Sequence, residues 1–126
     1  MAINHRQVLG RRAGSYSQGV AVPAGRLVFI SGQVPVDDSG NVVGSDITTQ
    51  ARDVFNKIRQ LLEEAGGSMA DITKITAYLT DISQIAEYGK VRAEAFGPDY
   101  PASASVEVSA LVHPGLFLEV EAIAVI

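Results

Sequence analysis

The sequence contains no cysteine. A disulfide framework and a thiolate nucleophile are therefore excluded, and the missing disulfides are compatible with the cytosol. A zinc site would depend on two histidines and on carboxylates, a ligand set that disfavours zinc in this chain. We expect no metal site.

Long hydrophobic runs and an excess of basic residues are also missing. No stretch approaches the roughly 20 apolar residues of a membrane-spanning helix, and residues 1–6 start polar, without the apolar run of a signal peptide. The net charge of −4 and the pI near 5.0 disfavour a protein whose main task is to bind nucleic-acid phosphates. We therefore expect a soluble, cytoplasmic protein with neither a membrane nor a nucleic acid as its partner.

The chain of 126 residues fits one domain, residues 1–126, with a single hydrophobic core. It has no internal repeat, low-complexity tract or linker. Residues 19–22 read as a strand, residues 23–25 as a turn, and residues 27–30 as an apolar strand suited to burial on both faces. The two strands are predicted to form a hairpin.

The segment that ends at Ala65 predicts an amphipathic helix. Its N-cap is Ser45 or Asp46, and Gln50 lies near the position of a capping-box partner. One apolar stripe recurs at helical spacing, made of Ala51, Val54, Phe55, Ile58, Leu61, Leu62 and Ala65. Two glycines follow at positions 66 and 67, where glycine tolerates the left-handed conformation that ends a helix.

The rest of the chain predicts further strands and a second helix. Residues 75–79 alternate as a half-buried strand, and a helix runs from Asp81 or Ser83 to about Phe96. Another strand follows residue 101, and residues 117–126 form a long final strand. This order predicts an α+β fold in which two helices pack on one face of a mixed sheet. Because several strands are apolar on both sides, we expect the uncovered face to meet another subunit.

Four segments carry a resemblance to a known family. Residues 14–19 read G-S-Y-S-Q-G, residues 29–35 read F-I-S-G-Q-V-P, and residues 118–124 read L-E-V-E-A-I-A. The first predicted helix, which contains Gln50 and Ala51, is the fourth segment. In order and spacing these resemble the Rid family, the reactive intermediate deaminases also called the YjgF-type family. The resemblance covers the chain from about residue 14 to its last residue.

The resemblance implies a chorismate-mutase-like α+β subunit that assembles as a homotrimer. The sheets would face inward in a barrel-like core, with three clefts between neighbouring subunits. In the family's deaminases these clefts hydrolyse enamine and imine products of pyridoxal-phosphate enzymes to a keto acid and ammonia. The resemblance implies no cofactor and a small-molecule substrate.

Site residues follow from the same resemblance. Tyr16 takes the place of the family's cleft tyrosine, and Ser31 and Gly32 match the backbone that lines the cleft. Glu119 matches the carboxylate that positions or activates water. Gly89 falls in the second helix, where many members have asparagine, and as a glycine within a helix it costs about 1 kcal/mol relative to alanine.

Ser103 departs from the family pattern. Imine deaminases of the family read P-A-R after the second helix, and that arginine holds the substrate carboxylate, whereas residues 101–103 here read P-A-S. A guanidinium binds a carboxylate through two charge-assisted hydrogen bonds, and a serine offers one neutral donor. We therefore expect a substrate other than 2-iminopropanoate, bound through Ser103 and Ser105.

A replacement cation is the other expectation that follows from Ser103. The first candidate is Arg92, in the second helix near Gly89. Arg26 and Arg12 are the next candidates. The alternative interpretation of each arginine is an ordinary solvated surface residue.

Each of these assignments has a structural alternative. The side chains of Glu119 and Glu121 point to the same face of a strand, where two close carboxylates favour acid–base chemistry. The alternative is that both are solvated or ion-paired strand residues. Tyr16 is either a hydrogen-bond donor or a packed loop tyrosine. Residues 31 and 32 either present backbone N–H groups to an oxyanion or form a bulge. Glu107, His5 and His113 are expected to be structural or solvated.

Three functions remain open from the sequence. The first is a hydrolase or deaminase acting on enamine, imine or related activated C=N metabolites at intersubunit clefts. The second is a non-catalytic, metabolite-binding regulatory trimer. The third, a role on nucleic acid, is disfavoured by the acidic charge balance.

Overall fold

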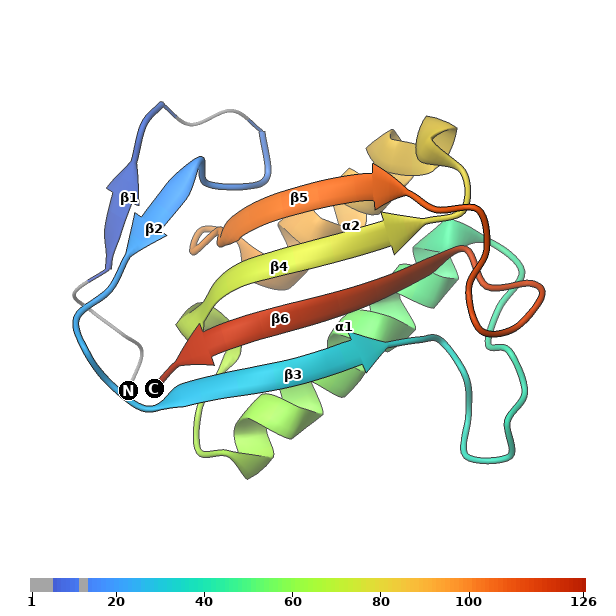
Figure 1. Cartoon of the computed structure of the whole chain (residues 1–126), viewed down its shortest axis with the longest axis horizontal. Coiled ribbons are helices and arrows are strands. Elements are labelled where there is room, and N and C mark those ends of the chain that lie inside the picture. Colours follow the sequence, from blue (N-terminus) through green and yellow to red (C-terminus); the bar gives the residue numbers. More distant parts are fainter. Residues whose placement is uncertain (1–5, 12–13) are drawn as a thin grey trace.

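The computed structural model describes residues 6–11 and 14–126 of the chain (Figure 1). The helices are α1 (Ile47–Glu64) and α2 (Ile85–Phe96), with short 3-10 turns η1 (Met69–Asp71) and η2 (Ile82–Gln84). The strands are β1 (Gln7–Leu9), β2 (Gly19–Ala21), β3 (Leu27–Gln33), β4 (Ile72–Leu79), β5 (Ala102–Glu107) and β6 (Leu118–Val125).

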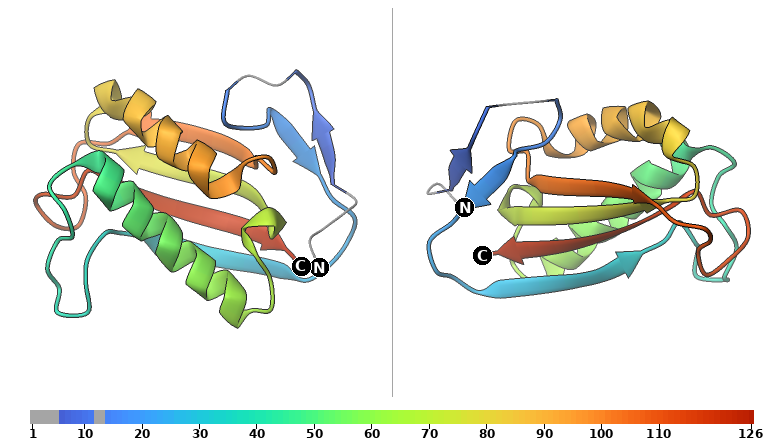
Figure 2. Two further views of the ribbon diagram at one scale, coloured as in Figure 1. Left: turned by 180° about the vertical axis from the view of Figure 1, so that it is seen from behind. Right: turned by 45° about the horizontal axis from the view of Figure 1, so that its top comes forward.

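Four strands form a mixed sheet in the order β3-β6-β4-β5. Strand β6 is antiparallel to both β3 and β4, whereas β4 and β5 run parallel. Both helices pack on the same face of this sheet, as Figure 2 shows from behind. The predicted α+β fold, with two helices on one face of a mixed sheet, is confirmed.

The predicted hairpin between residues 19–22 and 27–30 is wrong. Strand β2 pairs with β1 in a separate two-stranded sheet, and β3 pairs with β6 from the far end of the chain. The three residues of β2 are exposed or half-buried, so they offer little apolar surface to the core. In contrast, β3 contributes Ile30 to the core and joins β6 through Arg26 and Ile126, which exchange two backbone hydrogen bonds.

Helix α1 places its predicted apolar stripe against the sheet. Ala51, Val54, Phe55, Ile58 and Leu62 are buried, and the helix ends before Gly66, which has φ +91°. Asp46 is the N-cap, and its carboxylate accepts a hydrogen bond from the Thr49 N–H at 2.7 Å.

The sequence placed Gln50 near the position of a capping-box partner. In the structure Gln50 lies one residue beyond that position, does not act as the partner and is fully buried. Its amide donates to the carbonyls of Gly44 and Gly115 and accepts from the Phe117 N–H at 2.7 Å. Gln50 therefore joins the start of α1 to the loop that leads into β6.

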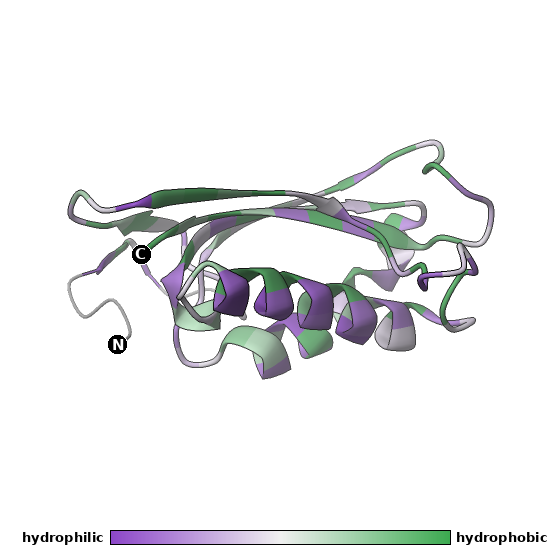
Figure 3. Ribbon diagram, turned by 90° about the horizontal axis from the view of Figure 1, so that it is seen from below, coloured by the Kyte–Doolittle hydropathy of each residue, from purple (hydrophilic) through white to green (hydrophobic). Residues whose placement is uncertain are grey.

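The sheet has one covered face and one open face within the single chain. Along β4, Ile75, Ala77 and Leu79 are buried beneath the helices, so Thr76 and Tyr78 lie on the opposite side. Strand β3 was expected to be buried on both faces, but Leu27 and Phe29 are 58% and 72% exposed. Figure 3 shows the sheet edge-on, with both helices below it. We refer to the other side as the open face.

The predicted second helix is present, but it is divided into the 3-10 turn η2 and the helix α2. Asp81 caps η2 by accepting from the Ser83 N–H, and α2 then runs to Phe96.

Among the described residues no helix is long and apolar enough to cross a membrane. The same residues contain no group of three or more His, Cys, Asp or Glu that could hold a metal ion.

Candidate functional site

Most of the site residues expected from the sequence lie in one of two clusters, together with three residues that the sequence did not single out. The arginine cluster comprises Ser15, Tyr16, Tyr88, Gly89, Arg92 and Ser103. The glutamate cluster comprises Ser31, Gly32, Tyr78, Glu119 and Glu121.

Hydrogen bonds hold Arg92 between the amino-terminal loop and β5. Its Nε–H donates to the Ser15 hydroxyl at 3.0 Å, and its Nη1 lies 3.5 Å from the Ser103 hydroxyl. The Ser15 hydroxyl donates in turn to the Gly89 carbonyl at 3.1 Å. Arg92, the first candidate for a replacement cation, thus lies against the position where the family pattern has its arginine.

Two tyrosine rings flank the Arg92 guanidinium. Its central carbon lies 5.4 Å from the centroid of the Tyr16 ring and 5.2 Å from that of Tyr88, within the range of cation–π attraction. Tyr88 is fully buried, and its ring stacks on Phe55 in the core. Burial raises the pKa of Tyr88 to about 12, against the opposing effect of the neighbouring Arg92 charge. The phenol therefore stays protonated at neutral pH.

The loop that carries Ser15 and Tyr16 is fixed at the start of β5. The Ser17 N–H donates to the Pro101 carbonyl at 3.0 Å, and its hydroxyl donates to the Tyr100 carbonyl. Ser17 and Ala102 also form a parallel bridge. These contacts set the distance between the loop and Ser103, one residue further along β5.

The glutamate cluster is built around an irregularity in β3. The register between β3 and β6 shifts between Ile30 and Gln33, so Ser31 and Gly32 form a bulge. A Cβ at Gly32 would lie 2.7 Å from Cδ and 2.9 Å from Cγ of Glu119. The carboxylate of Glu119 therefore lies directly on the Gly32 backbone, in space that only glycine leaves open.

The second glutamate has a partner of its own. The Tyr78 hydroxyl donates to a carboxylate oxygen of Glu121, and this hydrogen bond raises the pKa of Tyr78. Among the described residues, the Glu119 carboxylate makes no hydrogen bond or ion pair. Glu119 is thus the carboxylate of the pair that is available to a water or a ligand.

The two clusters lie on opposite faces of the sheet. Glu119 pairs in register with Tyr78 on the open face, whereas Ser103 pairs with Ile75, whose side chain is buried beneath the helices. Strand β4 also separates β6 from β5. One copy of the chain does not bring Arg92 and Glu119 to a common surface.

A family model described as Endoribonuclease L-PSP matches residues 10–126 of this chain. A RutC family protein of Pyrococcus abyssi is 43% identical over 112 residues, which cover 88% of this chain and 86% of that protein. The chain belongs to this family, whose members include the Rid and YjgF-type proteins.

Solved structures of the Rid family share the fold. RidA from an Antarctic Psychrobacter superposes with a TM-score of 0.75 at 37% identity, over 92% of each chain. The Rid protein YyfB of Yersinia pestis, described as a protein of unknown function, gives a TM-score of 0.85 at 27% identity, over 97% of this chain and 99% of that one. The resemblance read from the sequence is confirmed at the level of family and fold.

Other expected residues of this Rid protein lie apart from the clusters. Arg26 donates to the Ala65 carbonyl at the end of α1, so it serves as a helix cap. Ser105 points to the same side of β5 as Ser103, and its hydroxyl makes no hydrogen bond among the described residues. Glu107 accepts from the Ile82 N–H at 2.9 Å, a structural role as expected, and His113 is an exposed turn residue. Arg12 and His5 lie outside the described residues.

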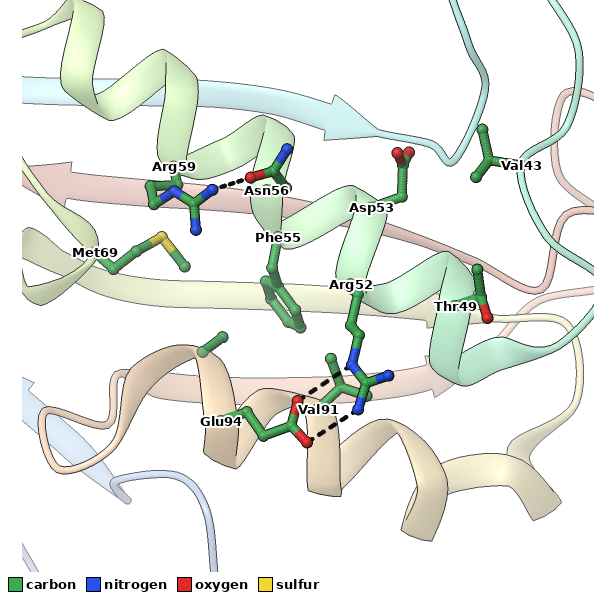
Figure 4. A pocket seen from close by; sticks show the side chains of 11 residues that line it. Val43, Thr49, Arg52, Asp53, Phe55, Asn56, Arg59, Met69, Val91 and Glu94 are labelled. Carbon is green, nitrogen blue, oxygen red and sulfur yellow. Dashed lines mark hydrogen bonds and ion pairs between the residues drawn. The ribbon is translucent and has the colours of Figure 1, made fainter.

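A groove of about 610 Å³ lies between α1 and α2 (Figure 4). Phe55, Val91 and Met69 are among its apolar lining residues, and the ion pair of Arg52 with Glu94, at 3.1 Å, crosses one side. None of the site residues expected from the sequence lines this groove.

Sequence reasoning missed Ser15, Tyr78 and Tyr88 as members of the clusters. Helical spacing was a usable signal for Tyr88, which precedes Arg92 by four residues on α2. Tyr78 required the register between β4 and β6, which depends on pairing between distant segments. Ser15 required the path of the amino-terminal loop.

Proposed function

We propose that this chain is a small-molecule hydrolase or deaminase of the Rid type, acting on imine and enamine metabolites. The observation that carries the proposal is the placement of Glu119. Its carboxylate lies on the Gly32 backbone in the β3 bulge, on the open face, without a described hydrogen-bond partner. A carboxylate in this position can orient a water molecule and accept its proton.

The reaction needs no more than this general base and a bound imine. Water adds to the imine carbon, and its proton passes by way of Glu119 to the nitrogen. The hydroxyl proton of the carbinolamine then passes to the nitrogen as the C–N bond breaks, which releases ammonia and leaves a carbonyl product. An enamine enters the same sequence after its β-carbon takes up a proton.

The active unit is a homotrimer in which each site lies between two copies. The open face supports this assembly because it exposes Leu27, Phe29 and Val106, at 58%, 72% and 43%. The opposite placement of the two clusters supports it as well, because a second copy can bring its arginine cluster to the first copy's Glu119. An interface that joins two different surfaces can close into a ring, and in the proposed assembly the ring has three copies.

The direct test is hydrolysis of imines generated in place by an amino-acid oxidase. A panel that starts with 2-iminopropanoate and extends to larger 2-imino acids allows for the serine at position 103. We expect turnover that disappears in Glu119→Ala and persists in Glu64→Gln, a change at an exposed glutamate of α1. A correctly folded wild-type protein that hydrolyses no imine of the panel contradicts the proposal and leaves a metabolite-binding regulator.

RNA cleavage, which the family description names, is a weaker candidate for this chain. The net charge of −4 provides little attraction for a phosphate backbone. Ribonuclease activity that survives stringent purification and is lost in Glu119→Ala would favour that function instead.

A further inference from the structure

Arg92 is a buried cation that forms no ion pair with the part of the chain that the structure describes. Its side chain belongs to a residue that is only 9% exposed. Among the described residues, the ion pairs are Arg52 with Glu94 and Lys57 with Asp53, and no carboxylate pairs with Arg92. A buried charge is costly unless it is paired, so this guanidinium is expected to have a partner that the chain itself does not supply.

The hydrogen-bonding capacity of Arg92 is also only partly used. The planar guanidinium has five N–H donors, of which the described contacts use one on Nε and one on Nη1. Both acceptors are neutral serine hydroxyls. The fully buried Tyr88 hydroxyl is a further neutral group beside the guanidinium. None of these neighbours carries the negative charge that would balance Arg92.

We propose that Arg92 binds the carboxylate of the substrate, so that this chain acts on 2-imino or 2-enamino acids. This inference rests on the proposed function, because it places the carboxylate group next to the reacting C=N bond. A planar carboxylate fits the planar fork of a guanidinium, and the flanking rings of Tyr16 and Tyr88 favour a flat group. The Tyr88 hydroxyl supplies a further neutral donor.

Two small residues make the placement of Arg92 possible. A Cβ at Gly89 would already lie 3.7 Å from Nη2 of Arg92 and 3.9 Å from the Ser15 hydroxyl, so a longer side chain would compete for this space. An arginine at position 103 would put a second guanidinium beside the first, and like charges repel. The cation therefore comes from α2 instead of β5, and the serine at position 103 is its companion. The expectation from sequence that simple 2-imino acids are excluded rested on a missing cation, and Arg92 supplies one.

The test measures the binding of a stable compound that resembles the product, so it does not depend on turnover. Pyruvate and its neutral isostere pyruvamide are titrated by NMR into the millimolar range, against wild type, Arg92→Gln and Arg52→Gln. We expect wild type to prefer pyruvate, and Arg92→Gln to bind it roughly 10- to 100-fold more weakly. Arg52→Gln, a change at an exposed arginine on α1, is expected to bind as wild type does.

A variant that moves the positive charge distinguishes carboxylate binding by Arg92 from a purely structural role as an anchor for Ser15. The double variant Arg92→Gln/Ser103→Arg lacks the Ser15 contact but returns a guanidinium to the same place. We expect it to regain the preference for pyruvate over pyruvamide. Unchanged pyruvate affinity in a folded Arg92→Gln protein overturns the inference. Equal affinity of wild type for the two compounds overturns it as well, whether or not the variants fold.

Failure of this inference and failure of the proposed function give different results. Imine hydrolysis that is insensitive to Arg92→Gln and to the substrate carboxylate removes the inference and keeps the function. Pyruvate binding that depends on Arg92, without hydrolysis of any imine, removes the function and keeps the binding site.

Discussion

At the scale of single residues, glycine at position 32 and serine at position 103 have the same kind of role. Each leaves room for a charged side chain that comes from another element. Gly32 admits the carboxylate of Glu119 from β6, and Ser103 admits the guanidinium of Arg92 from α2. A small residue within a strand can thus determine where a distant functional group lies.

Gly32→Ala is expected to lower imine hydrolysis at least about tenfold by moving the Glu119 carboxylate. Its melting temperature should fall little, because a glutamate side chain on the open face can rotate away. Steady-state rates and thermal melts measure the two effects. If the substitution acts through Glu119, the small fall in melting temperature should disappear in a Glu119→Ala background, where that side chain is absent. The same fall in that background would show an effect that is independent of Glu119.

Part of the candidate site, including Arg92 and Glu119, could be named from the sequence, but the arrangement of its residues could not. Arg92 was a candidate because it lies near Gly89 in a predicted helix. Its contact with Ser103 depends on the packing of α2 on β5, and no local pattern encodes that packing. The alternation of β6 places Glu119 and Glu121 on one face, but the Tyr78 hydrogen bond that distinguishes them comes from β4.

At the scale of elements, α1 is the best-defined part of the fold. Its apolar stripe was readable from helical periodicity, and five of the seven predicted residues are buried. The other two lie near the end of the helix, where Leu61 is 39% exposed and Ala65 is half-buried. The hairpin prediction failed because the partner of β3 lies about a hundred residues away in sequence, where local turn signals carry no information.

Gln50→Ala is expected to destabilise the protein by roughly 3 kcal/mol. The substitution leaves the Gly115 carbonyl and the Phe117 N–H without their buried partner and creates a void at the start of α1. Urea denaturation measures the change. Gln60→Ala, at an exposed position of the same helix, should stay within roughly 0.5 kcal/mol of wild type. Equal stability of the two variants would contradict the proposed role of Gln50.

Acid should remove the stability that the Asp46 cap of α1 contributes to the fold. Hydrogen bonds from Thr49 lower the pKa of Asp46 below its ordinary value of 3.8. A lowered folded-state pKa means that the carboxylate stabilises the fold above pH 3.8, and that this stabilisation is lost as the pH falls through the folded-state pKa. The difference in melting temperature between wild type and Asp46→Ala should therefore shrink in acid. A difference that stays constant as the pH falls would contradict this account of the cap.

At the scale of the whole molecule, the open face is the surface on which the proposed function depends. It contains Glu119 and also the exposed Phe29, so the proposed chemistry and the proposed assembly use the same surface. The protein should therefore lose activity when it cannot assemble, even with every site residue intact.

Phe29→Glu is expected to give a folded monomer without imine hydrolase activity. Sedimentation velocity gives the oligomeric state, and circular dichroism shows whether the fold is kept. Leu61→Glu places the same charge at an exposed apolar position of α1, and this variant should remain a trimer with normal activity. An active monomer would show that one chain suffices for catalysis.

Mixing two inactive variants tests the central claim most directly, because it asks whether each site combines groups from two copies. Arg92→Gln and Glu119→Ala subunits are unfolded together in equal amounts, refolded and assayed for hydrolysis of 2-imino acids. Random assembly in a ring of three gives about one quarter of the interfaces both intact groups, so the mixture should recover about one quarter of wild-type activity. If Arg92 and Glu119 act within the same chain, every site lacks one of them and the mixture stays inactive, which would contradict the shared cleft.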